Sequence, residues 1–136
     1  MSKPRIVIAD DHPKVLNRIA EFLADEFEIV ALVPDGAAAV KAVLAAQPDI
    51  LILDIAMPEM DGIEAAKRLR DLCSSVKIIF LTAAADREPQ FDSWQNVGAQ
   101  GYVLKARMRS DLVLAIRTVL EGGTFFLPDG HSPRTE

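Results

Sequence analysis

The sequence predicts an α/β fold in which a doubly wound, five-stranded parallel sheet is covered by helices on both faces. Five short apolar runs alternate with five amphipathic helical segments over 136 residues, a length typical of one domain. Most of the runs are continuous rather than alternating, as in strands that are buried on both faces. The expected strands are RIVIA from Arg5, EIVALV from Glu28, DILIL from Asp49, VKIIFL from Val76 and QGYVL from Gln100.

The first three helices have recognisable starts and stops. Pro13 stands in the opening turn of the first, where its missing N–H does no harm. The second runs from Gly36 to Gln47-Pro48. Asp61 opens the third, and Glu64 three residues later resembles a capping box. The residues expected to face inward are Val15, Leu16, Ile19, Phe22 and Leu23 in the first helix and Ile63, Ala66 and Leu69 in the third.

The last two helices are predicted from similar signals. The fourth opens near Asp86 and stops at Gly98, with Phe91, Trp94 and Val97 spaced by threes. The fifth has Ser110 as its expected N-cap and Gly122-Gly123 at its end, with a stripe of Leu112, Ile116, Val119 and Leu120. Residues 1–127 are expected to form the domain, and residues 128–136 a tail or the start of a linker.

Composition excludes several classes of protein. A net charge of −5 argues against direct nucleic-acid binding by this segment, because a phosphate-binding surface needs surplus Lys and Arg. No apolar run approaches the roughly 20 residues that span a bilayer, so no membrane association is expected. Cys73 is the only cysteine, which rules out an intrachain disulfide and a cysteine zinc site. The cytoplasm is the expected compartment.

Polar side chains stand at the ends of four expected strands. Asp10 and Asp11 follow the first, Asp54 ends the third, Thr82 the fourth and Lys105 the fifth. In open α/β sheets these carboxyl ends share one rim, where ligands bind. The sequence therefore predicts one site that contains three carboxylates, a hydroxyl and an ammonium group.

Three neighbouring carboxylates need a counter-charge. At ~4 Å, a like-charged pair costs about 4 kcal/mol at an effective dielectric constant of 20, so the site must hold protons or a cation. An all-oxygen cluster selects a hard ion such as Mg²⁺. Thr82 and Lys105 are expected to be donors without acceptor carboxylates of their own, suited to phosphoryl oxygens. Since an Asp carboxylate can be the nucleophile in phosphoryl transfer, Asp54 is the expected acceptor of a phosphoryl group.

These residues together resemble the receiver domain of two-component response regulators. The resemblance rests on Asp10-Asp11, on Asp54 with MPEMDG after it, on Thr82-Ala83 and on GYVLKA with Lys105, and it covers roughly Arg5 to Leu127. The segment AIRTVLEGGTFFLP is further similar to receivers of the NarL/LuxR subfamily, which precede a helix-turn-helix DNA-binding domain.

The resemblance implies a flavodoxin-like fold with strand order 2-1-3-4-5 and a role in phosphorelay signal transduction. Asp54 would accept a phosphoryl group from a sensor histidine kinase, with Mg²⁺ (or Mn²⁺) as cofactor. Asp11, Asp54 and the backbone carbonyl of Ala56 would bind the metal directly, and Asp10 mostly through water. Thr82, Lys105 and the backbone N–H of Ala83 would hold the phosphoryl oxygens, and Tyr102 stands where the family has its rotating aromatic switch.

The same resemblance implies partners and a limit on catalysis. Phosphorylation would favour a homodimer and control a DNA-binding output domain, hence transcription. The protein would not be an enzyme beyond catalysing its own phosphorylation and slow dephosphorylation. Ala106 departs from the family pattern, because many receivers have a cis proline after the lysine. We therefore expect the chain after Lys105 to follow a trans path.

Plainer roles and other functions remain open from the sequence. Asp10 could cap the first helix, Lys105 could be a solvated lysine, and Tyr102 could be a core aromatic; His12 fits a helix start better than a metal ligand. A flavin- or nucleotide-binding domain shares the architecture, but ADDHPKV offers acids where a phosphate loop is needed. A phosphatase with an Asp nucleophile would need an acid at Ala56. A receiver that acts without phosphate, or one that stands alone without an output domain, is the further alternative.

Overall fold

A computed structural model describes residues 3–57, 60–72, 74–83 and 98–125 of the chain. The strands are β1 (Arg5–Ala9), β2 (Glu28–Val33), β3 (Ile50–Asp54), β4 (Lys77–Thr82) and β5 (Gly101–Leu104). The helices are α1 (Pro13–Leu23), α2 (Gly36–Ala46), α3 (Gly62–Asp71) and α5 (Met108–Leu120), and a 3-10 turn, η1 (Lys105–Arg107), joins β5 to α5. The predicted fourth helix, Cys73 and the tail from residue 128 lie outside the described residues.

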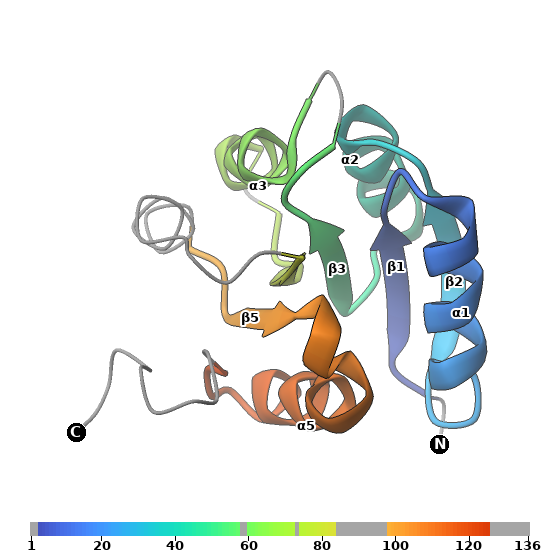
Figure 1. The fold of residues 1–136 in the computed structure, drawn as a ribbon. Coiled ribbons are helices and arrows are strands. Elements are labelled where there is room, and N and C mark those ends of the chain that lie inside the picture. The colour runs from blue at the N-terminus through green and yellow to red at the C-terminus, as the bar shows by residue number, and fades with distance from the viewer. Residues whose placement is uncertain (1–2, 58–59, 73, 84–97, 126–136) are drawn as a thin grey trace.

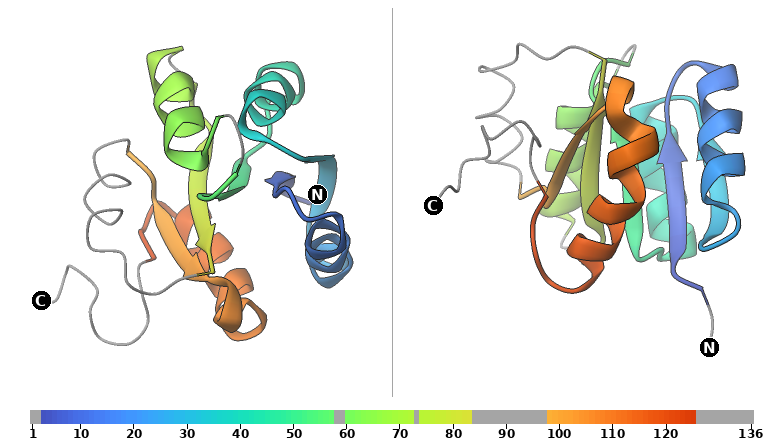
Figure 2. Two further views of the ribbon diagram at one scale, coloured as in Figure 1. Left: turned by 45° about the horizontal axis from the view of Figure 1, so that its top comes forward. Right: turned by 60° about the horizontal axis from the view of Figure 1, so that its bottom comes forward.

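The five strands form one parallel sheet in the order β2-β1-β3-β4-β5, which confirms the predicted topology (Figure 1). Helices α1 and α5 cover one face, and α2 and α3 cover the other, as Figure 2 shows. Because successive side chains of a strand point to opposite faces, each strand supplies both cores. In β1, Val7 packs toward α2 and α3, while Ile6 and Ile8 pack toward α1 and α5.

Most predicted helix signals are present in the structure. Pro13 is the first residue of α1, and Asp61 and Glu64 form a complete capping box at the start of α3. One expectation about α1 is wrong. Phe22 is 37% exposed on α1 because Leu16, Ile19 and Leu23 already fill the buried stripe.

Ser110 is not the N-cap of α5. The helix begins two residues earlier, at Met108, because the turn after Lys105 runs directly into it and makes Arg107 the N-cap. Within the described segments, no helix is both long and apolar enough to cross a bilayer.

Candidate functional site

Asp54 is the last residue of the most deeply buried strand. All five residues of β3 are buried, and Asp54 itself is only 3% exposed. Its Oδ1 accepts a hydrogen bond of 3.2 Å from the backbone N–H of Ala56. Burial without further partners would be costly for a carboxylate, so this side chain depends on the groups around it.

Gly62 fixes the chain that returns from Asp54 to α3. Its N–H donates to the carbonyl of Ile55 at 2.9 Å. A Cβ at this position would lie 2.4 Å from the carbonyl oxygen of Asp54 and 2.9 Å from the Cα of Ile55. Both neighbours are backbone atoms, so only glycine allows α3 to start this close to the end of β3. Packing thereby explains the glycine of the MDG segment.

The end of β1 places two more acids beside Asp54. Asp10 is 1% exposed, and its Oδ1 accepts from the backbone N–H of His12 at 2.9 Å. Asp11 is partly exposed. His12 is the N-cap residue of α1, but its side chain makes no capping hydrogen bond. Its Nδ1 instead lies 3.1 Å from Asp10 Oδ1 and 3.0 Å from Asp11 Oδ1. The sequence predicted His12 only as a residue at the helix start and did not predict these contacts.

Lys105 reaches the acids from the end of β5. Its Nζ lies 2.7 Å from Asp10 Oδ2 and 3.2 Å from Asp54 Oδ2. The expectation that Lys105 is a donor without carboxylates of its own is therefore wrong. The ammonium group of Lys105 relieves the repulsion between the two buried acids, because it lies within reach of both. The plain reading of Lys105 as a solvated lysine is also excluded, because its side chain is 18% exposed.

The electrostatics of the cluster follow from this arrangement. Burial, followed by the charge of Asp10, raises the pKa of Asp54 from its ordinary 3.8 to about 6, against the opposing effect of Lys105. Burial alone would lower the pKa of Lys105, but the hydrogen bond to Asp10 and the charge of Asp54 raise it above 10.5. Asp54 is thus held close to the pH at which it gains or loses its charge.

The cluster also satisfies the basic requirement of a cation site. Asp10, Asp11, His12 and Asp54 each offer one ligand atom, and these atoms lie within 4.8 Å of one another. Three of the four donors are carboxylates, which suit a hard divalent ion, and the partly exposed Asp11 leaves room for water ligands. The residues present therefore fit the predicted metal.

The other predicted residues surround the same rim. Thr82 ends β4, is 6% exposed and pairs in register with Leu104, the residue before Lys105. Ala83 follows it and is exposed, as is Ala56 on the β3 side. Tyr102 is fully buried and belongs to the core cluster that packs on α2 and α3. The core-aromatic role of Tyr102 is thus confirmed, and its switching role stays a prediction.

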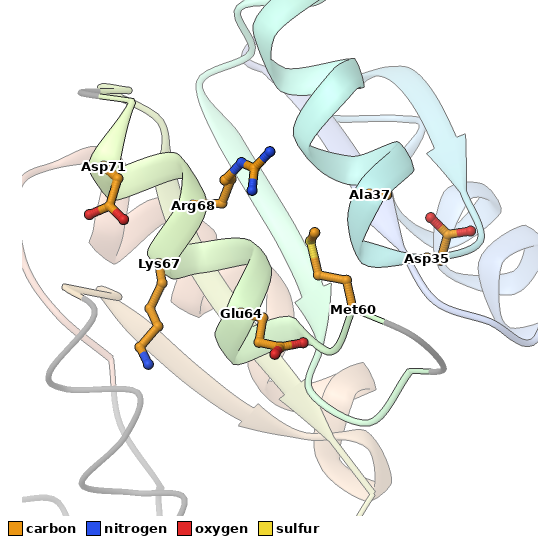
Figure 3. Close-up of a pocket in the computed structure, with 7 residues that line it drawn as sticks. All are labelled: Asp35, Ala37, Met60, Glu64, Lys67, Arg68 and Asp71. Carbon is orange, nitrogen blue, oxygen red and sulfur yellow. The ribbon is translucent and has the colours of Figure 1, made fainter.

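A separate cavity of about 570 Å³ lies between α2 and α3 (Figure 3). It is lined by Asp35, Ala37, Met60, Glu64, Lys67, Arg68 and Asp71. None of the rim residues Asp10, Asp11, Asp54, Thr82 and Lys105 lines it. This cavity carries charged side chains of both signs but no buried acid. The candidate site is therefore identified by its converging polar groups and not by this cavity.

Comparison with known proteins places the chain in one family. The sequence model of the response regulator receiver domain family matches residues 6–117 of this chain. The oxygen regulatory protein NreC of Staphylococcus epidermidis is 39% identical over 124 residues, which are 89% of this chain and 56% of NreC. The chain therefore spans about half the length of the curated relatives it matches.

Solved structures agree with this result. The signal receiver domain of NarL from Mycobacterium tuberculosis superposes with a TM-score of 0.84 at 30% identity, covering 90% of this chain and 99% of that chain. A LuxR-family two-component response regulator from an Aurantimonas species gives a TM-score of 0.87 at 29% identity, covering 94% and 92%. With its fold, its strand-end acids and these relatives, the chain belongs to the response regulator receiver domains, of the NarL/LuxR type.

Proposed function

We propose that this receiver is a phosphorylation switch in which Asp54 accepts a phosphoryl group from the phosphohistidine of a sensor histidine kinase. The observation that supports it best is the pairing of a 3% exposed Asp54 with Lys105 at 3.2 Å beside a second buried acid. Such a carboxylate is fixed in direction, stripped of bulk water and accompanied by a cation that can follow the incoming charge.

The transfer follows from these contacts. A carboxylate oxygen of Asp54 attacks the phosphorus atom, the P–N bond to the donor imidazole breaks, and the imidazole retains the electron pair and takes up a proton. Lys105 stays at the site as an ammonium group. It exchanges its contact with the carboxylate oxygen of Asp54 for a hydrogen bond to an oxygen of the phosphoryl group. Thr82 and the N–H of Ala83 bind the remaining oxygens from the end of β4.

Asp11, Asp54 and the carbonyl of Ala56 would hold Mg²⁺ (or Mn²⁺), with Asp10 acting mostly through water. When bound, this ion neutralises the charge that gathers on the transferred phosphoryl group. The protein is not an enzyme in this proposal, because it catalyses only its own phosphorylation and slow dephosphorylation.

The phosphoryl group changes the surface over β5 and α5. Shifting a population from 1:99 to 99:1 takes about 5.5 kcal/mol. One charge-assisted hydrogen bond contributes roughly 1.5–3 kcal/mol, so Thr82, Lys105 and Ala83 must act together. Thr82 moves toward the phosphoryl group, and Tyr102 turns into the space it leaves. Structures with and without beryllofluoride test this step, which is wrong if both side chains keep their positions.

The output of the switch is proposed from the relatives. One structural neighbour from Staphylococcus aureus is described as a DNA-binding response regulator of the LuxR family. We infer that phosphorylation favours a homodimer of this receiver and controls transcription through a DNA-binding output domain. A cytoplasmic location stays a prediction.

Phosphorylation by a small donor tests the proposal. Incubation with acetyl phosphate and Mg²⁺ should add about 80 Da, the mass of one phosphoryl group, to the intact protein. Asp54→Asn should abolish the adduct, and chelation of the metal should prevent it. Asp71→Asn, which changes an exposed acid on α3, is the matched control and should label like the unchanged protein. Undiminished labelling of Asp54→Asn would place the acceptor elsewhere.

A further inference from the structure

The turn that carries Lys105 lacks the restraint of a proline. Lys105–Arg107 form the 3-10 turn η1, closed by a hydrogen bond from the N–H of Met108 to the carbonyl of Lys105. Ala106 is exposed, and no peptide bond among the described residues is cis. Since a methyl group restrains the backbone far less than a pyrrolidine ring, other contacts must hold this turn.

Those contacts come from the first turn of α5. Arg107 Nε donates to Asp111 Oδ2 at 3.1 Å. The hydroxyl of Ser110 lies 3.0 Å from Asp111 Oδ1 and 3.1 Å from the carbonyl oxygen of Arg107, and it donates to one of them at a time. Asp111 is only 6% exposed, whereas the side chain of Arg107 is 52% exposed. A buried carboxylate thus anchors an exposed arginine at the end of the turn.

Helix stability does not account for the arginine of this pair. Arg107 is the N-cap of α5, where a cation opposes the helix dipole, and Arg109 adds a second cation in the same turn. An arginine four residues before an acid is also the less stabilising order of an ion pair on a helix. Burying Asp111 adds a desolvation penalty. Asp111 itself stands in the first turn of α5, where a carboxylate favours the helix dipole. The arginine is therefore the member of the pair that the helix does not explain and that the turn explains better.

We propose that Arg107 and Asp111 are positioning residues that hold η1 so that Lys105 reaches the two buried acids. Lys105 Nζ must span from this turn to Asp10 Oδ2 at 2.7 Å and to Asp54 Oδ2 at 3.2 Å, on two different strands. A long, flexible side chain can keep both contacts only if its own backbone is fixed. The pair acts through Lys105 and touches neither the metal ligands nor the phosphoryl group.

Two substitutions break the pair and one control leaves it intact. Arg107→Met removes the charge at an exposed position, and Asp111→Asn removes it from the buried partner. Arg117→Met is the matched control, because Arg117 pairs with Glu26 from the other end of the same helix. Arg107→Lys is the conservative variant. It keeps the charge and should retain part of the positioning of Lys105 that Arg107→Met loses.

The first measurement uses unphosphorylated, metal-free protein. The side-chain ammonium of Lys105 should give a protected signal in a ¹H–¹⁵N correlation spectrum, assigned by its loss in Lys105→Arg. We expect this signal to weaken or disappear in Arg107→Met and Asp111→Asn and to persist in Arg117→Met. An unchanged signal in Arg107→Met, a variant at an exposed site that should fold normally, would overturn the inference.

The second measurement rests on the proposed function and uses beryllofluoride with Mg²⁺. Affinity should fall by about tenfold in Arg107→Met, because a charge-assisted hydrogen bond from a misplaced Lys105 is weakened, and should be unchanged in Arg117→Met. If the unaltered receiver binds no beryllofluoride, the proposed function fails, while the ammonium signal still decides the positioning role. Equal affinities in all variants would contradict the positioning role alone.

Discussion

The starts of α3 and α5 both border the candidate site, but they are built in different ways. Helix α3 begins with a complete capping box, in which Asp61 Oδ1 accepts from the N–H of Glu64 at 2.9 Å. Gly62 then packs against the backbone of Asp54. Helix α5 begins at Met108, and its N-cap, Arg107, makes no side-chain capping hydrogen bond and is the last residue of the turn that carries Lys105.

This difference separates the site into a fixed side and an adjustable side. The acceptor carboxylate stands on a buried strand whose exit is held by the backbone contacts of Gly62 with Asp54 and Ile55. Lys105 is held by ion pairs, and ion pairs can exchange partners when a new anion arrives. A switch needs both properties, because the acceptor must stay in place while the groups that respond to the phosphoryl group move.

The largest expected effect tests the fixed side. Gly62→Ala should lower the free energy of unfolding by about 3 kcal/mol, because the new Cβ would meet two backbone atoms closer than 3 Å, although alanine is the better helix former. Urea denaturation measures the change. In the control Gly123→Ala the nearest atoms are Cγ2 of Thr118 at 3.1 Å and the carbonyl oxygen of Thr118 at 3.3 Å. Both lie beyond 3 Å, so the loss should stay below about 1 kcal/mol. Equal losses would mean that the exit of β3 is not specially constrained.

The next effect concerns the charge of Asp54 and its dependence on pH. In the folded, metal-free protein burial raises the pKa of Asp54 from 3.8 to about 6, so the folded state binds a proton more tightly than the unfolded state. Its contribution to stability is therefore complete below about pH 4 and is lost as the pH rises through 6. Asp54→Asn, which has no such charge, should be more stable than the unaltered protein by about 2 kcal/mol at pH 7.5.

Urea titrations of both proteins between pH 4 and pH 7.5 measure this difference, which should shrink toward acid pH. Asp71→Asn is the control, because Asp71 is exposed. A constant difference between the two proteins across this range would show that Asp54 does not titrate there, and that Lys105 neutralises it more fully than the structure indicates.

The two sides also differ in what could be predicted from the sequence. The strands, the capping box and the convergence of Asp10, Asp54 and Lys105 follow from local patterns and from the rule that strand ends share a rim, whereas the strand order was implied by the resemblance to receiver domains. These features depend on hydrophobic periods and short-range backbone chemistry, which a sequence displays directly.

The missed features depend on which groups compete for the same partners. Ser110 has the composition of an N-cap, but the helix starts earlier because the turn after Lys105 continues into it. The ring of His12 contacts Asp10 and Asp11, and Lys105 bridges Asp10 and Asp54. These pairings depend on which side chains the fold brings together, and the sequence alone does not show this. The pair Arg107–Asp111 stands four residues apart, a spacing that signals a helical ion pair but gives no sign that the acid is buried.

The smallest expected effect compares the two helix starts directly. Asp61→Ala removes a side chain that caps α3 and should lower the free energy of unfolding by about 1 kcal/mol. Ser110→Ala removes a hydroxyl inside α5 that has two alternative acceptors, Arg107 O and Asp111 Oδ1, and leaves Asp111 bound to Arg107, so the loss should stay below about 0.5 kcal/mol. Chemical denaturation of the two variants side by side measures both values. A larger loss for Ser110→Ala than for Asp61→Ala would mean that the start of α5 is at least as firmly fixed as that of α3, and the proposed difference between the two helix starts would be wrong.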